Sequence, residues 1–311
     1  MRTGRGTIRR MTPSLAARSA ATPLGAWFLA ARPKTLPAAV SPVVVGCAVA
    51  WSEGGFHVVS AVAAFAVALL LQIGANLAND VADFRRGADT AERLGPVRVT
   101  QSGLIRPERV AMATAVVLVL AAVPGLYLVW RGGWVLAGLG LLAMLAAVAY
   151  TAGPKPFGYL GLGEVFVFLF FGPVAVIGTT YVMTGSVSPL AILASLPMGS
   201  LITAILVVNN LRDIDTDRAA GKRTLAVRIG REATRREYAI LLAAAYAAPL
   251  AMIVVGVAQL WVLLAWATAP LAVVLVRQVW TAAERALNPV LGGTARLCLW
   301  FAVALSAGIV V

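Results

Sequence analysis

Long apolar runs, each about as long as a membrane-spanning helix, alternate with polar breaks along nearly the whole chain. A helix needs roughly 20 mainly apolar residues to cross a bilayer. The segments that come close to that length are 34–51, 58–78, 110–130, 133–150, 163–182, 189–208, 238–257, 259–276 and 294–311. This pattern predicts an all-α polytopic membrane protein with nine transmembrane helices.

The composition excludes the other broad classes of protein. Hydrophobic residues make up 60% of the 311 residues and charged residues 13%, and the mean hydropathy is +0.86. A soluble domain is nearer about half apolar and about one quarter charged, and a disordered chain needs low hydrophobicity. Two cysteines and one histidine form no disulfide framework, zinc site or haem site.

The charges indicate how the helices are oriented. The chain has 26 Lys and Arg against 13 Asp and Glu, a net charge of +13. Basic residues tend to stay on the cytoplasmic side of a membrane, and with nine spans only Arg131 falls on the opposite face. We therefore attribute the excess to topology in the lipid bilayer, not to nucleic-acid binding. An N-in/C-out arrangement in the cell (plasma) membrane is expected.

The same pattern divides the chain into two parts. Residues 1–25 are expected to form a disordered basic cytoplasmic tail, and residues 26–311 the transmembrane domain. Two long polar loops, roughly 79–109 and 209–237, lie on the cytoplasmic side, whereas the outer loops are very short. We therefore expect the active site on the cytoplasmic face.

Two acid-rich motifs end the second and sixth predicted helices. The residues that share a helix face are Asn76, Asp80 and Asp83 in the first motif and Asn209, Asp213 and Asp217 in the second. Asp215 points elsewhere. Each motif ends the second helix of a four-helix block, which indicates a weak internal repeat with motifs at 76–89 and 209–222.

A bound cation would relieve the cost of these acid clusters. Like charges at i and i+4 repel by roughly 0.2–0.5 kcal/mol per pair, and carboxylates at a helix C-terminus oppose the macrodipole. Oxygen-only ligands suit Mg²⁺, which takes one or two carboxylates together with substrate phosphates. Solvated loop acids that balance nearby arginines are the alternative, and the presence of two similar motifs favours the metal.

Basic residues near the acids complete a receptor for a diphosphate. They are Arg85, Arg86, Arg98, Lys155, Arg212, Lys222 and Arg223. A Walker-type phosphate loop is missing from the sequence, which argues against an ATP-driven pump. A diphosphate site at the mouth of an apolar bundle predicts a lipid-tailed substrate. Its allylic tail would ionise beside the metal and be captured by a nucleophile.

These residues resemble the UbiA superfamily of intramembrane aromatic prenyltransferases, over nearly the whole chain from about residue 26. The resemblance rests on residues 76–83 and on Asp213-x-x-x-Asp217. It implies nine helices around a central cavity and two Asp-rich motifs that bind prenyl diphosphate through Mg²⁺. One position departs from the family, because Gly87 stands where a third acid often follows. Asp89, beyond that glycine, is a weaker candidate than Asp80 or Asp83.

Further stretches are similar to the branch of this family that prenylates 1,4-dihydroxy-2-naphthoate in menaquinone biosynthesis. They are residues 32–37, 79–80 with 87–90, 95–103, and 150–156 with 161–164. The branch implies transfer of a polyprenyl group from polyprenyl diphosphate to 1,4-dihydroxy-2-naphthoate, with loss of the carboxylate, giving demethylmenaquinol. Another acceptor, 4-hydroxybenzoate or homogentisate, is an alternative. A lipid-diphosphate transporter is a third interpretation, which the nearly charge-free spans disfavour.

The resemblance also implies a role for each candidate residue. The expected catalytic residues and Mg²⁺ ligands are Asp80, Asp83, Asp213 and Asp217, with Asn76 and Asn209 completing or orienting the shell. Those expected to contact the diphosphate are Arg98, Arg212, Lys222 and Asn79. Either Lys155 or Lys34 would bind the naphthoate carboxylate. Glu164 is either a helix-start acid or a cavity residue, and the glycines around it favour the cavity.

Overall fold

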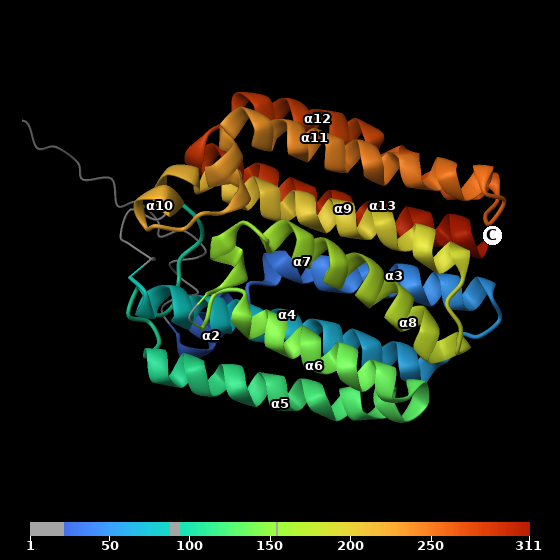
Figure 1. Ribbon diagram of the computed structural model, residues 1–311, viewed down its shortest axis with the longest axis horizontal. Coiled ribbons are helices and arrows are strands. Elements are labelled where there is room, and N and C mark those ends of the chain that lie inside the picture. Colours follow the sequence, from blue (N-terminus) through green and yellow to red (C-terminus); the bar gives the residue numbers. More distant parts are fainter. Residues whose placement is uncertain (1–21, 88–93, 154) are drawn as a thin grey trace, which may run out of the picture.

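The structure, a computed structural model, describes residues 22–87, 94–153 and 155–311, and this part of the chain is helical without strands. Figure 1 shows long helices lying side by side, with the C-terminus at one end and α10 at the other. Among the described residues, eight helical segments are long and apolar enough to cross a membrane, and α6 (Trp134–Ala149) is an additional, shorter apolar helix. The all-α architecture predicted from the apolar runs is therefore confirmed.

The spans follow the predicted order. The first four are α2 (Pro23–Ala31) with the turn η1 (Pro33–Thr35) and α3 (Leu36–Ser52), then α4 (Val58–Arg85), α5 (Pro107–Gly132) and α6. The short turn η2 (Phe157–Leu160) leads to a fifth span made of α7 (Gly163–Leu169), η3 (Phe170–Val174) and α8 (Ala175–Thr184). The rest are α9 (Pro189–Arg212), the short α10 (Ile214–Ala219), α11 (Leu225–Val254), η4 (Leu260–Thr268) with α12 (Ala269–Thr281), η5 (Glu284–Ala286) and α13 (Leu287–Val310).

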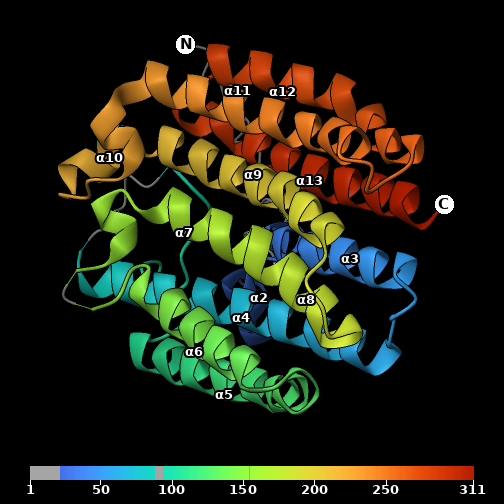
Figure 2. The ribbon, with the colours of Figure 1, turned by 45° about the vertical axis from the view of Figure 1, so that its right-hand side comes forward.

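Helix α9 is the buried centre of the bundle. It packs against α3, α7, α11 and α13, and Figure 2 shows α9 and α13 between the α11–α12 pair and the α3–α7 side. The core at this junction is built from fully buried apolar side chains, among them Val49, Met198, Leu201, Phe301 and Leu305. Because α9 carries the second acidic motif at its C-terminus, that motif stands on a rigid support.

Three boundaries differ from the sequence prediction. Helix α11 begins at Leu225, where the hydroxyl of Thr224 caps its first turn, although its charged first turns predicted a loop to residue 237. Gly230, with φ 81°, breaks the helix inside this segment. Helix α13 likewise begins at Leu287, seven residues before the predicted span. Of the expected tail, residues 1–21 lie outside the described residues, and α2 already begins at Pro23.

The fifth span contains a π-helical turn at Phe170–Val174. Pro173 lies inside this turn and lacks the N–H that a regular helix would use, which accounts for the local widening. The turn lies tight against α9, because a Cβ on Gly172 would come 2.9 Å from the carbonyl oxygen of Ser195. The successive side chains Phe170 and Phe171 both face the central cavity as a result.

Candidate active site

The C-terminal ends of α4 and α9 meet at one end of the molecule, where Lys222 links the two acidic motifs. The Nζ atom of Lys222 lies 3.1 Å from Oδ1 of Asp83 and 3.9 Å from Oδ1 of Asp217. Lys222 follows α10, after a turn at Gly221 with φ 74° that favours glycine. The prediction that the two motifs come together on one side is therefore confirmed.

Asp83 lies at the centre of this junction and is almost fully buried. Its Oδ2 is 3.1 Å from a terminal nitrogen of Arg98, and its Oδ1 accepts a 2.6 Å hydrogen bond from the hydroxyl of Tyr159. Arg86 and Lys222 lie over the Tyr159 ring, at 5.3 and 4.6 Å from its centroid. Burial and the adjacent Asp83 carboxylate raise the pKa of Tyr159, so the phenol stays a neutral hydrogen-bond donor.

Asp80 makes contacts that the sequence did not predict. Its carboxylate accepts hydrogen bonds from the backbone N–H groups of Val99 and Thr100, both at 3.1 Å, and from the Thr100 hydroxyl. Asp80 does not line the cavity, whereas Asn79 and Asp83 do. The expectation that Asp80 holds Mg²⁺ therefore has no support in this geometry, which assigns it to anchoring the 94–100 segment.

Helical geometry explains why the first motif divides in this way. From Gln72 to its C-terminal end, α4 lines the cavity with Gln72, Ala75, Asn76, Asn79 and Asp83. They follow the spacing i, i+3, i+4, i+7 and i+11 and so lie within one stripe. Asp80 is rotated by roughly 80° from Gln72 at about 100° per residue. Asn79 accepts a 2.7 Å hydrogen bond from Thr151 through its side-chain oxygen.

Arg212 organises the second motif from a fully buried position, 1% exposed. Its guanidinium donates to both carboxylate oxygens of Asp213, at 2.8 and 2.6 Å, and to the side-chain oxygens of Asn209 and Asn288, at 2.8 and 2.9 Å. These donors are directed at protein groups, so Arg212 supports the second motif; it also lines the cavity, and its contact with the diphosphate stays a prediction. The helix also stops here, since Asp213 caps α9 before α10 begins.

The 94–100 segment covers both motifs. Asn288 donates to the carbonyl oxygen of Leu94 at 2.9 Å, and Gly95 approaches Arg212 so closely that a Cβ would lie 2.8 Å from the guanidinium. Farther along, Arg98 reaches Asp83. The segment thus needs a glycine at position 95 and ties the end of α4 to the ends of α9 and α13.

A cavity of about 1680 Å³ opens at this junction and extends between the helices. Its polar end is lined by Asn79, Asp83, Arg98, Asn209, Asp213, Asp217 and Lys222, and its interior by apolar residues of α3 to α9 and α13. Phe157, Phe166 and Phe170 form a stack, with ring centroids 4.0 and 6.3 Å apart and interplanar angles of 21° and 11°. Such a volume exceeds the roughly 300–1,000 Å³ of most small-molecule sites.

Of the remaining candidate residues, one lines the cavity and two do not. Lys34 lines the cavity, whereas Lys155 is exposed and does not. Glu164 is buried in the first turn of α7, accepts a 2.8 Å hydrogen bond from Asn210, and does not line the cavity. Glu164 is therefore the helix-start acid and not the cavity residue that we favoured. In this position the macrodipole of α7 stabilises its carboxylate. Asp89 lies outside the described residues.

Asp215 points away from the junction, as predicted, and pairs with Arg231 and Arg218 at the surface. Sequence reasoning missed Tyr159, which lies between two of the stretches that resemble the family branch, residues 150–156 and 161–164. Its aromatic neighbours gave no sign that its hydroxyl would reach Asp83.

The donor set fits a magnesium ion that is bound together with a diphosphate. Among the described residues, no cluster of three or more His, Cys, Asp and Glu side chains could hold a metal by itself. Carboxylates from both motifs nevertheless approach one cation, the Lys222 ammonium group. Asn79 and Asn209 line the same cavity. Mg²⁺ usually takes one or two carboxylates and completes its shell with phosphates and water.

Comparisons with known proteins agree with this arrangement. Residues 39–307 match the model of the UbiA prenyltransferase family. The chain is 43% identical over 223 residues to the 1,4-dihydroxy-2-naphthoate octaprenyltransferase of Escherichia coli, covering 70% of this chain and 72% of that one.

Solved structures show the same fold at low sequence identity. A UbiA homologue from Aeropyrum pernix in its apo form has a TM-score of 0.67 at 15% identity, over 86% of this chain and 96% of that one. A UbiA homologue from Archaeoglobus fulgidus, bound to DMAPP and Mg²⁺, has a TM-score of 0.59 at 14% identity, over 90% and 99%.

Proposed function

Because the chain belongs to the UbiA prenyltransferase family, we propose that it transfers a polyprenyl group from an allylic diphosphate to 1,4-dihydroxy-2-naphthoate. The observation that carries the proposal is the junction of two acidic motifs at the polar mouth of a large apolar cavity. The acceptor is supported by relatives named 1,4-dihydroxy-2-naphthoate octaprenyltransferase, 43% identical in Escherichia coli and 39% identical in Mycobacterium leprae. The product would be demethylmenaquinol.

Asp83 and Asp217, with the amide oxygens of Asn79 and Asn209, are the residues proposed to hold Mg²⁺. The bound ion would supply Lewis-acid stabilisation of the leaving diphosphate. Lys222 and Arg98, which now pair with Asp83, are placed to neutralise phosphate oxygens. Asp213 and Asn209 are held in position by Arg212. Asp80 contributes through the 94–100 segment.

The cavity walls provide for the two organic groups. The apolar interior would hold the polyprenyl tail, and the rings of Phe157, Phe166 and Phe170, which line the cavity, would stabilise a developing allylic cation. Lys34 is the proposed partner of the acceptor carboxylate, because it lines the cavity and Lys155 does not. Departure of CO₂ from the ring and formation of the new C–C bond then complete the substitution.

The active site is proposed to face the cytoplasm of the plasma membrane. The described part of the chain is an integral membrane protein whose site lies at one end of the bundle, near α10 (Figure 1). The basic residues concentrate at this end, and Arg131 is at the other, in the last turn of α5. Retention of positive charge on the cytoplasmic side supports the orientation.

A transfer assay with each acceptor tests the proposal. Membranes that contain the protein are incubated with Mg²⁺, labelled polyprenyl diphosphate and one of three acceptors: 1,4-dihydroxy-2-naphthoate, 4-hydroxybenzoate or homogentisate. We expect a labelled, decarboxylated product with the naphthoate alone. Product with 4-hydroxybenzoate and none with the naphthoate would overturn the acceptor assignment. Movement of intact diphosphate without any product would favour a transporter.

A further inference from the structure

A glutamine lies deep in the membrane-spanning part of α4, on the stripe that faces the cavity. Gln72 precedes Arg85, the last residue of α4, by 13 positions, which places it roughly 20 Å along the helix at about 1.5 Å per residue. Its side chain lines the cavity together with Asn76 and Asn79. A carboxamide at this depth is costly unless it is hydrogen-bonded, so its surroundings are informative.

A directed network of hydrogen bonds fixes the orientation of this carboxamide. The Thr35 hydroxyl donates to the carbonyl oxygen of Arg32 at 2.9 Å, so toward its other neighbours it can only accept. Asn76 donates through Nδ2 to the carbonyl oxygen of Ala31 and to Thr35 Oγ1, both at 3.0 Å. Asn76 therefore has only its Oδ1 left to offer to Gln72.

Both neighbours of Gln72 thus require a donor. Its Nε2 lies 3.4 Å from Thr35 Oγ1 and 3.5 Å from Asn76 Oδ1, and the two N–H groups of the amide satisfy both acceptors. The reverse orientation would place the Gln72 oxygen against two acceptors, which is repulsive. These hydrogen bonds, which start at the backbone carbonyls of Ala31 and Arg32, therefore turn Oε1 of Gln72 away from Thr35 and Asn76.

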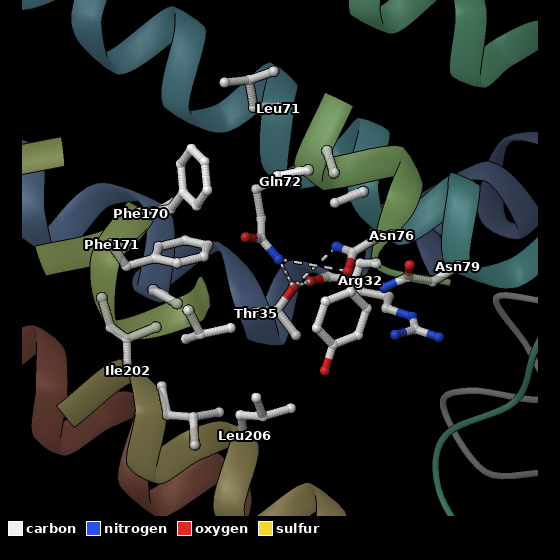
Figure 3. A pocket seen from close by; sticks show the side chains of 18 of the residues that line it. Arg32, Thr35, Leu71, Gln72, Asn76, Asn79, Phe170, Phe171, Ile202 and Leu206 are labelled. Atoms are coloured by element: carbon white, nitrogen blue, oxygen red, sulfur yellow. Dashed lines mark hydrogen bonds between the residues drawn. The ribbon is translucent and has the colours of Figure 1, made fainter. Parts of the chain in front are cut away.

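That oxygen faces a wall that is otherwise apolar. Figure 3 shows the Gln72 nitrogen turned toward Thr35 and the oxygen turned to the side of Phe171. Phe170, Phe171, Ile202 and Leu206 line this part of the cavity. Gln72 is half-buried, and an acceptor in such apolar surroundings favours a ligand that donates a hydrogen bond over one that does not.

Two basic residues close to Thr35 in the sequence also line the cavity. Arg32 and Lys34 both line the cavity and directly precede Thr35 in the sequence, at three positions and one position before it. Arg32 adopts a left-handed conformation, with φ 52°, which is rare for a residue with a side chain and is found preferentially at functional sites. This part of the cavity thus combines two basic side chains, which suit an anion, with the neutral hydrogen-bond acceptor Oε1 of Gln72.

We propose that Gln72 selects the aromatic acceptor by accepting a hydrogen bond from its ring hydroxyl. This rests on the proposed function, in which the acceptor is 1,4-dihydroxy-2-naphthoate. Its carboxylate would meet the Arg32–Lys34 side, and the hydroxyl at ring position 4, remote from the carboxylate, would donate to Oε1 of Gln72. Gln72 is then a specificity-determining residue, and Thr35 and Asn76 are the positioning residues that orient it.

A ligand-variant cycle tests this assignment. The wild type and Gln72→Leu are compared by KM for 1,4-dihydroxy-2-naphthoate and by the inhibition constant of 1-hydroxy-2-naphthoate, which lacks the second hydroxyl. We expect the variant to raise KM for the dihydroxy compound about 5- to 10-fold, the loss of one neutral hydrogen bond. Inhibition by the monohydroxy compound, and KM for the prenyl diphosphate, should stay within about twofold.

Further variants separate recognition from general damage. Thr35→Val removes the acceptor that fixes Gln72 and should give part of the same selective loss, whereas Thr35→Ser keeps the hydroxyl and should restore wild-type selectivity. Gln278→Leu makes the same chemical change at an exposed position of α12 outside the cavity and should change neither constant.

Two results would overturn the inference while the proposed function stands. One is an unchanged KM for the dihydroxy compound in Gln72→Leu, and the other is equal weakening of both ligands. If the Leu variant fails to accumulate, the Thr35 pair decides by the same criteria. A wild-type protein that prenylates no dihydroxynaphthoate would overturn the proposed function, and the inference with it.

Discussion

Replacing Asp80 with asparagine is expected to lower kcat 10- to 100-fold without changing the Mg²⁺ concentration for half-maximal activity. Asp80 does not line the cavity, and its carboxylate holds the backbone of Val99 and Thr100. The substitution should therefore release the 94–100 segment, and with it Arg98, from the junction. It should not remove a metal ligand.

The magnitude follows from the hydrogen bonds that are lost. A hydrogen bond to a charged group contributes about 1.5–3 kcal/mol. Asparagine keeps one acceptor oxygen, so it loses at least one of the two 3.1 Å backbone bonds and the charge that strengthens the other. The N–H donors belong to Val99 and Thr100, at 0% and 3% exposure, which water does not reach. A loss of about 1.5–3 kcal/mol corresponds to roughly 10- to 100-fold in the docked population of the segment.

The assay is prenyl transfer measured as a function of Mg²⁺ concentration. Asp83→Asn is the matched comparison, because it makes the same chemical change one helical turn away at a cavity-lining position, and it should raise the Mg²⁺ requirement at least about tenfold. Thr100→Val removes only the hydroxyl bonds to Asp80 and should give a smaller loss of kcat. If Asp80→Asn shifts the Mg²⁺ requirement as Asp83→Asn does, Asp80 is a metal ligand and the anchoring role is refuted.

Three shorter predictions address the rest of the site. Tyr159→Phe removes the 2.6 Å hydrogen bond to the Asp83 carboxylate and should lower kcat/KM about 10- to 100-fold, as expected for a bond to a charged group. Because the pKa of Tyr159 is raised, the wild type should show no loss of activity from phenol ionisation up to about pH 10. An inflection there that Tyr159→Phe abolishes would contradict this. Lys34→Gln should raise KM for the naphthoate about tenfold and leave KM for the prenyl diphosphate unchanged, whereas the reverse pattern would place Lys34 at the diphosphate. Chelation with EDTA should abolish transfer, and added Mg²⁺ should restore it; persistent activity in EDTA would rule out the proposed metal-bound diphosphate.

The sequence was sufficient for the order of the apolar helices, which in the described residues are eight candidate spans and the shorter α6, and for the meeting of the two motifs, because both follow from local patterns of hydropathy and charge. It could not tell which carboxylate of α4 faces the cavity. Asp80 and Asp83 differ only in helical phase, and the partner that decides their roles, residues 98–100, packs there through tertiary contacts. The direction of the Gln72 carboxamide likewise depends on Thr35, 37 positions away. Helix α11 begins early because tertiary packing and the Thr224 cap offset its charged first turns.

The π-helical turn at Phe170–Val174 should allow the fifth span to lose one residue without a change in the register of the helix that follows. A wide turn of this kind stores one residue more than a regular helix would need between the same two ends. Deleting a residue elsewhere in the span would rotate everything beyond it by roughly 100°, whereas a deletion inside the turn would be absorbed as the helix rewinds. Such a deletion would remove one aromatic ring from the cavity lining, while α8 keeps its register and the acidic motifs keep their places.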